Sequence, residues 1–164
     1  MVIQTFIATE SENEAVFYPE SSSELYERDF NLWIESTVKL LNEGRLTELD
    51  VPNLIEEVET MGRSEKFALS SDLVIVLLHL LKWKYQPNKR TRSWEKSIAE
   101  HRRRIIARIE GSPSLRGYYQ QTFNKCYANA RKQASIETKL SPNNFPEISP
   151  FSCEQVLDED FLPE

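Results

Sequence analysis

Apolar residues recur at intervals of three and four along most of the chain, which is the period of amphipathic α-helices. The pattern predicts five helices, at residues 21–44, 50–62, 64–85, 93–111 and 113–140. The expected apolar stripes of four of them are Phe30, Trp33, Thr37, Leu40 and Leu41; Leu54, Ile55, Val58 and Met61; Trp94, Ile98, His101, Ile105 and Ile109; and Leu115, Tyr119, Phe123, Cys126, Ala130 and Ala134. The remaining helix, 64–85, is apolar all round in its second half, which is typical of a central helix.

Capping and breaking residues set the expected boundaries. Ser21 with Glu24 fits a capping box, and Gly44 is a suitable residue for the end of the first helix. Asp50 can cap the second helix, and Gly62 either ends it or bends it into the next. These signals predict helices joined by short connections, which favours antiparallel neighbours.

The fold class expected is therefore all-α: a single-domain five-helix bundle, mostly antiparallel, with an extended Pro-rich C-terminal tail. We expect a flexible N-terminal arm at 1–20, the bundle at 21–140 and the tail, packed on the bundle, at 141–164. The tail residues expected to hold it there are Phe145, Ile148, Phe151, Leu157 and Phe161.

Charge is distributed unevenly along the 164 residues, whose net charge is −6. The stretch 82–108 holds ten Lys/Arg and two Glu, a net of +8, so the remainder carries −14. Such polarity can steer a charged partner, or two parts of one fold can neutralise each other. We favour the second interpretation.

Compartment signals point to a soluble cytoplasmic protein. The N-terminus lacks the basic region and long apolar core of a signal peptide, and the most apolar run, Leu73–Leu81, is far shorter than a membrane span. Cys126 and Cys153 have no metal-ligand spacing and are expected to be free thiols.

Glu56 and Glu59 lie three residues apart and so share a helix face, where carboxylates inside a bundle can hold metal ions. The usual Glu-x-x-His signature is absent, which weakens a metal site. His79 is the one polar residue in its apolar run, and with Glu65 and Asp72, each seven residues apart, it shares a face of a straight helix. It either ties two helices together, forms an acid–base pair or serves as a metal ligand. A candidate pocket would contain Glu56, Glu59, His79, Gln86 and Arg92.

The stretch KWKYQPNKRTRSW mixes Trp and Tyr with basic residues, the combination that binds single-stranded nucleic acid. The candidate contacts are Lys82, Lys84, Lys89, Arg90, Arg92 and Arg103. The same tryptophans are also placed to anchor a helical hairpin, and Lys96, Glu100 and Arg104 can pair locally at four-residue spacing.

Several long blocks resemble a known family. They are LYERDFNLWIESTVKLLNEGRLTELDVPNLIEEVETMGRSEK, HLLKWKYQPNKRTRSW, GSPSL, ETKLSPNNFPEISPF and LDEDFLP. Over residues 24–163 the chain is similar to the bacterial "domain of unknown function 29" family. The resemblance implies an all-α fold and no known activity. It includes Asn53, Glu56, Glu57, Glu59, Met61, Gly62, His79, Trp83, Gln86 and Trp94, and departs at His101, where the family pattern leads us to expect Gln.

No Walker A, GxGxxG, GxSxG or HExxH motif is present. We therefore expect a small non-catalytic interaction or regulatory module, with a possible protein partner and no metal, cofactor or membrane association. Two alternatives remain: a nucleic-acid-binding protein that uses the hairpin 82–108, and a carboxylate/His metal-assisted hydrolase. Whether the protein is an enzyme, and its oligomeric state, are left open.

Overall fold

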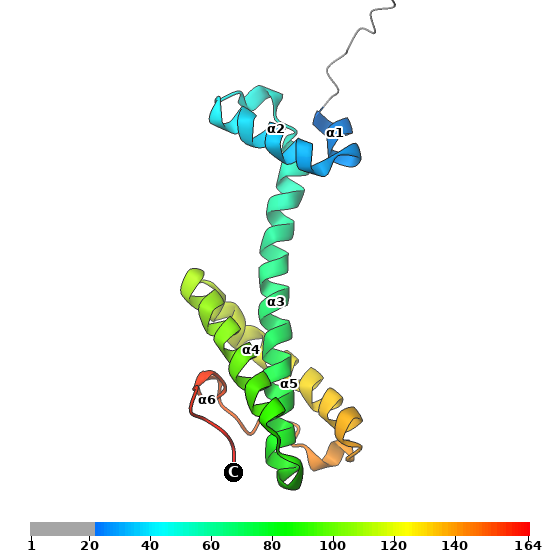
Figure 1. Ribbon diagram of the computed structural model, residues 1–164, viewed down its shortest axis with the longest axis vertical. Helices are drawn as coiled ribbons and strands as arrows, with labels where there is room; N and C mark the ends of the chain where they lie inside the picture. Colours follow the sequence, from blue (N-terminus) through cyan, green and yellow to red (C-terminus); the bar gives the residue numbers. More distant parts are fainter. Residues whose placement is uncertain (1–21) are drawn as a thin grey trace, which may run out of the picture. The chain divides into compact units, whose positions relative to one another are not determined.

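A computed structural model describes residues 22–164, which form helices and loops without a strand. The prediction of an all-α fold is confirmed. The elements are α1 (Ser22–Arg28), α2 (Phe30–Asn42), η1 (Leu46–Glu48), α3 (Val51–Tyr85), η2 (Pro87–Lys89), α4 (Arg92–Gly111), α5 (Leu115–Thr138), η3 (Pro142–Asn144) and α6 (Cys153–Leu157) (Figure 1). The arm predicted at 1–20 and the cap predicted at Ser21 lie outside the described residues.

The first predicted helix is two helices, because Asp29 interrupts it. Asp29 has φ −147° and ψ 84°, outside the helical region, and its Oδ1 accepts a hydrogen bond from the Leu32 amide at 3.0 Å. A short carboxylate side chain competes in this way with the backbone for amide donors, and it therefore begins a new helix here.

The second and third predicted helices are one continuous helix, α3, with Gly62 in its interior. A helical glycine costs only about 1 kcal/mol relative to alanine. The residues on either side are joined by hydrogen bonds, from Arg63 Nη1 to Glu59 Oε2 at 3.2 Å and from Arg63 Nη2 to Thr60 Oγ1 at 2.7 Å. Gly62 therefore neither ends nor caps the helix.

The described residues divide into two compact units, 22–57 and 58–164, where the sequence led us to expect one bundle over 21–140. In the first unit, Trp33 is 2% exposed and lies edge-on to Tyr26, with ring centroids 5.0 Å apart. The Tyr26 hydroxyl donates to Glu57 Oε1 at 2.7 Å. This hydrogen bond to a carboxylate raises the pKa of Tyr26 to about 12.

The core of the second unit is formed by the C-terminal half of α3, together with α4 and α5 (Figure 1). The helix 64–85 was expected to be central, and the stretch from Leu69 to Leu81 supplies its most buried residues. Ala130 and Ala134 of α5 are fully buried, and such small side chains allow helices to approach closely. Every member of the stripe predicted for α5 is buried.

The chain from residue 141 onward packs on this core. Phe145, Phe151 and Val156 are buried, while Ile148 is exposed. Hydrogen bonds to tail carbonyls come from Arg131 (Pro142 and Phe145), Tyr127 (Pro146), Tyr119 (Cys153) and Arg102 (Val156, Glu159 and Phe161). Backbone that forms no regular structure needs such donors in order to be buried.

Candidate functional site

The predicted pocket does not assemble around His79. Glu59 and His79 lie twenty residues apart on the continuous helix α3, which separates them by about 30 Å along its axis. Glu59 is exposed and pairs with Arg63. Glu56 belongs to the first unit and is exposed. The sequence allowed the helix to end or bend at Gly62, which would have let the chain fold back and bring these carboxylates near the histidine. Because α3 is continuous, it does not.

His79 has a local structural contact. Its Nδ1 lies 2.9 Å from the Ile75 carbonyl one turn earlier, and because a carbonyl can only accept, Nδ1 donates. Burial is the largest influence on this imidazole and lowers its pKa below the usual value of 6.5. The neutral ring is therefore the form that the fold favours.

The other two pocket candidates lie at the turn between α3 and α4. Gln86 is half-buried and its Nε2 donates to the Thr138 carbonyl at 3.5 Å. Arg92 is exposed at the first turn of α4. Within residues 22–164, no hydrogen bond or ion pair joins either side chain to His79, and no group of three His, Cys, Asp or Glu residues is arranged to hold a metal ion.

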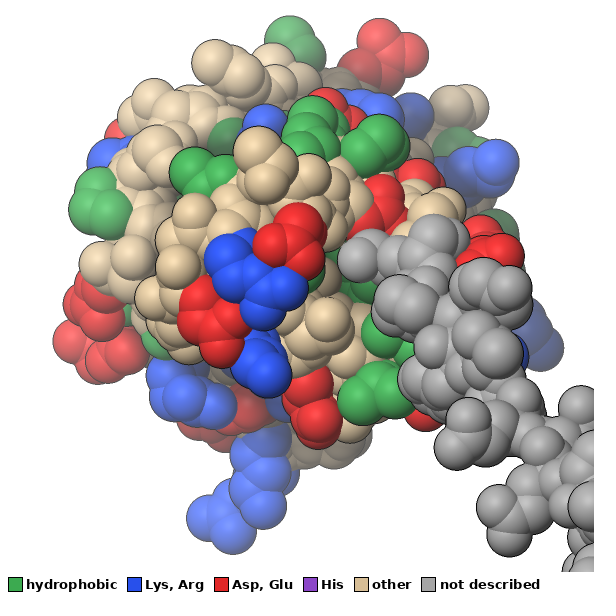
Figure 2. Space-filling model, turned by 90° about the horizontal axis from the view of Figure 1, so that it is seen from above, with side chains coloured by type: hydrophobic (Ala, Val, Ile, Leu, Met, Phe, Trp, Pro, Cys, Tyr) green, Lys and Arg blue, Asp and Glu red, His purple; other side chains and the backbone are tan. Residues whose placement is uncertain are grey.

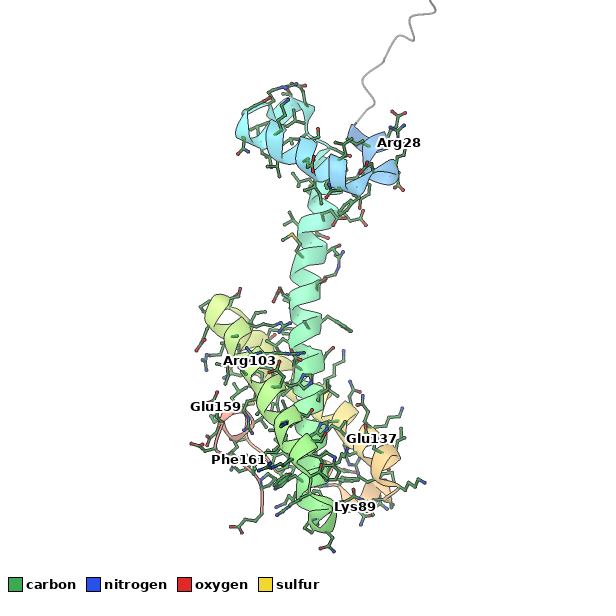
Figure 3. All side chains as sticks on the ribbon, in the orientation of Figure 1. Arg28, Lys89, Arg103, Glu137, Glu159 and Phe161 are labelled. Carbon is green, nitrogen blue, oxygen red and sulfur yellow. The ribbon has the colours of Figure 1, made fainter. Side chains whose placement is uncertain are left out.

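The charge of the basic hairpin is neutralised in part within the second unit, where four of its ten basic residues form ion pairs, Lys82, Arg103, Arg104 and Arg108. Lys82 bonds Glu137 at 2.7 Å and lies 4.6 Å from the centre of the Trp94 ring. Arg90 stacks on Trp83 and donates to the carbonyls of Trp83 and Pro163. Arg103, which Figure 3 labels on α4, pairs with Glu100 at 3.1 Å.

Of the predicted nucleic-acid contacts, Lys84, Lys89, Arg90 and Arg92 have no ion-pair partner among the described residues. Lys89 and Arg92 are exposed, and Lys84 is half-buried. Two of the six predicted contacts, Lys82 and Arg103, are thus paired with carboxylates. Nucleic-acid binding stays a prediction that the other four residues would have to carry.

A charge cluster that links α3 and α4 is centred on Asp72, which is 6% exposed. Asp72 Oδ1 accepts from His101 Nδ1 at 2.6 Å, and Oδ2 accepts from Arg108 Nη1 at 3.2 Å. Arg104 Nη1 lies 4.0 Å from Oδ1, and Arg108 Nε lies 3.6 Å from Glu65 Oε2. Asp72 and Glu65 both contact Arg108 and so share a face, as the spacing of seven indicated, but the histidine that Asp72 meets is His101, not His79.

In the first unit, α2 carries an exposed apolar face. Phe30, Ile34, Val38 and Leu41 form one stripe at helical spacing and are 46%, 40%, 50% and 45% exposed. The adjoining stripe of Trp33, Thr37 and Leu40 is buried. We call the four exposed residues the α2 face; Figure 2, seen from above, shows hydrophobic side chains at the surface among acidic ones.

Beneath this face, the Trp33 indole N–H is buried and has no acceptor within residues 22–164. A buried donor left unpaired costs roughly 1–3 kcal/mol. The sequence predicted Phe30 and Leu41 in the same apolar stripe as Trp33. Periodicity could not show that the side of α2 with Trp33 would be buried and the side with Phe30 and Leu41 exposed.

Comparison with known protein families shows to which family the chain belongs. The family model described as "Domain of unknown function DUF29" matches residues 25–162, nearly the whole protein. The chain belongs to the DUF29 family. No curated protein and no solved structure matches it significantly. The DUF29 resemblance read from the sequence blocks is thus confirmed.

The DUF29 match spans both compact units and every helix from α2 onward. Of the residues in the resembling blocks, Gln86 and Trp94 have contacts that hold helices together, since Gln86 bonds Thr138 and Trp94 lies beneath Lys82. Among residues 22–164 of this DUF29 protein, no helix is both long enough and apolar enough to cross a bilayer.

Proposed function

We propose that the protein is a non-catalytic interaction module, and that its first unit binds a basic amphipathic segment of another protein through the α2 face. The observation that carries this is the half-buried apolar arc of α2. About half of each of four large side chains is exposed, on the order of 300 Å² in all, which is the size at which a patch on a monomer is often functional.

The charge around the α2 face favours a basic partner. Residues 22–57 contain nine Asp/Glu and three Lys/Arg, a net of −6. Arg45, one of the three bases, already pairs with Glu43 and Glu48. A second copy of this unit would bring together two like-charged surfaces, whereas a segment with Lys or Arg beside its apolar stripe would be attracted.

The unpaired Trp33 N–H is consistent with an incomplete surface. An amphipathic helix that lays its apolar side along a groove or face uses anchors at the same three- and four-residue spacing that the α2 face presents. Burying the face would remove four large apolar side chains from water, which is the main driving force for such association.

The test uses the full chain and an 18-residue helical peptide of Leu and Lys, with a Leu/Glu peptide as its counterpart, and fluorescence anisotropy as the measurement. Val38→Asp is compared with Ile136→Asp, which changes an exposed β-branched residue on α5. We expect the Lys peptide to bind the wild type and I136D, and V38D to bind about tenfold more weakly. Since V38D adds negative charge, electrostatics alone would strengthen the binding, so a loss reports apolar contact.

Equal binding to wild type and V38D would refute the assignment to the α2 face. Binding of the Leu/Glu peptide as tight as that of the Lys peptide would refute the partner's charge. Sedimentation that shows a wild-type dimer, dissociated by V38D, would identify the occupant as a second copy instead.

A further inference from the structure

A groove between α3 and α5 in the second unit is lined by basic side chains. Its volume is about 420 Å³, within the range of small-molecule sites. Three cations line it, Arg63 and Lys66 from α3 and Lys125 from α5, and no carboxylate does. The groove beside α4, in contrast, contains both Glu100 and Glu159.

The cations of the groove are available to a ligand. Lys125 is exposed and forms no ion pair with the described residues. Lys66 Nζ lies 5.6 Å from the centre of the Tyr118 ring, a contact that an anion need not break. Arg63 pairs with Glu59, but both side chains are more than half exposed, so this pair contributes little.

Hydroxyl groups and an aromatic ring complete the groove. Ser70 Oγ and Tyr118 Oη lie 3.1 Å apart between the two helices, and either can donate to a ligand oxygen. Phe67 lines the groove together with the three cations, and its side chain is 75% exposed. An exposed ring offers a stacking surface for a planar ligand group.

We propose that the α3–α5 groove binds a small phosphorylated molecule with a planar ring, of the nucleoside monophosphate class. The phosphate lies among Arg63, Lys66 and Lys125, and the ring stacks on Phe67. Lys and Arg together with hydroxyl donors are the groups that proteins use for phosphate. The groove's volume accommodates one nucleotide, not a polymer. This site is separate from the α2 face and does not depend on it.

The experiment titrates the full chain with AMP, adenosine and inorganic phosphate, and follows backbone amide shifts by NMR. We expect saturable AMP shifts at residues 63–74 and 118–129, with weaker binding of phosphate and of adenosine. Lys125→Gln should weaken AMP binding about fivefold, and Lys132→Gln, an exposed lysine on the same helix, should leave it unchanged. Phe67→Ala should weaken AMP binding but not phosphate binding.

Three results would overturn the proposal. One is the absence of saturable shifts in the groove up to about 10 mM AMP, the limit of even weak specific binding. Another is an equal loss of affinity in K132Q and K125Q, which would indicate non-specific attraction to lysines. The third is tighter binding of a Glu-rich peptide than of AMP at the same amides, which would make the groove a peptide site. Amide dispersion in each variant shows that it is folded.

Discussion

Replacing Arg102 by methionine removes the side chain that holds the end of the chain to α4. Arg102 is 1% exposed, and it donates from Nε to the Val156 carbonyl at 2.8 Å and from Nη1 and Nη2 to the carbonyls of Glu159 and Phe161, both at 3.1 Å. Figure 3 shows Glu159 and Phe161 on the C-terminal segment beside α4. Methionine keeps much of the apolar stem but offers no donor.

The cost follows from what each carbonyl loses. Val156 is fully buried, so its acceptor would be left without water, at about 1–3 kcal/mol. Glu159 is exposed and Phe161 is half-buried, so their carbonyls can be rehydrated at little cost. Burial lowers the pKa of Arg102, and removing a partly desolvated cation returns some free energy. We expect R102M to lower the free energy of unfolding by about 1–3 kcal/mol.

Urea unfolding followed by circular dichroism measures this loss, and hydrogen exchange of residues 151–162 reports local release of the tail. The matched control is Arg103→Met on the same helix, an exposed arginine whose described contacts are all with Glu100. It should cost less than about 1 kcal/mol. If R102M loses no more than R103M and exchange at 151–162 is unchanged, the three hydrogen bonds contribute no net stability.

Three further changes test other features of the second unit. Gly62→Ala should raise the unfolding free energy by about 0.5–1 kcal/mol, because a Cβ there meets no atom within 4 Å; a loss in urea unfolding would show that the helix needs glycine. His79 has a lowered folded pKa, so its stabilising effect is complete above about pH 6.5 and is lost as pH falls and the unfolded chain takes up the proton first. Wild type should therefore lose more stability than His79→Gln between about pH 7 and pH 5.5 in parallel urea titrations, and equal losses would contradict this. Asp72→Asn should cost about 2–3 kcal/mol, since it weakens contacts with partly exposed cations; a double-mutant cycle with Arg108→Met should show coupling of at least about 0.5 kcal/mol, and additivity would refute a direct pair.

The α2 face and the α3–α5 groove are independent features of two different units. One is apolar within an acidic unit, and the other is cationic and contains hydroxyl groups. Variants at one should leave binding at the other unchanged. The V38D and K125Q proteins serve as folded controls for each other's experiment, and cross-effects between them would show that either substitution disturbs the fold.

The sequence by itself predicted the helical class and most of the buried stripes. Ile98, Ile105 and Ile109, and the stripe of α5, are buried where the periodicity placed them. Helical period depends on residues three and four apart, so it is determined locally. Arg102 lies four residues after Ile98 and three before Ile105, so the same periodicity places it on the buried face of α4. Its basic neighbours nevertheless led us to expect an exposed side chain.

Tertiary structure alone decided which polar groups meet. His101 was expected in an apolar stripe, and its pairing with Asp72 depends on the alignment of α3 and α4, for which no short-range signal exists. The α3–α5 groove likewise joins side chains more than forty residues apart in the chain. Gly62 could end, bend or continue a helix, and the sum of small local terms around it settled which. Local free energies specify helices, but which helix faces are covered depends on distant segments that periodicity does not encode.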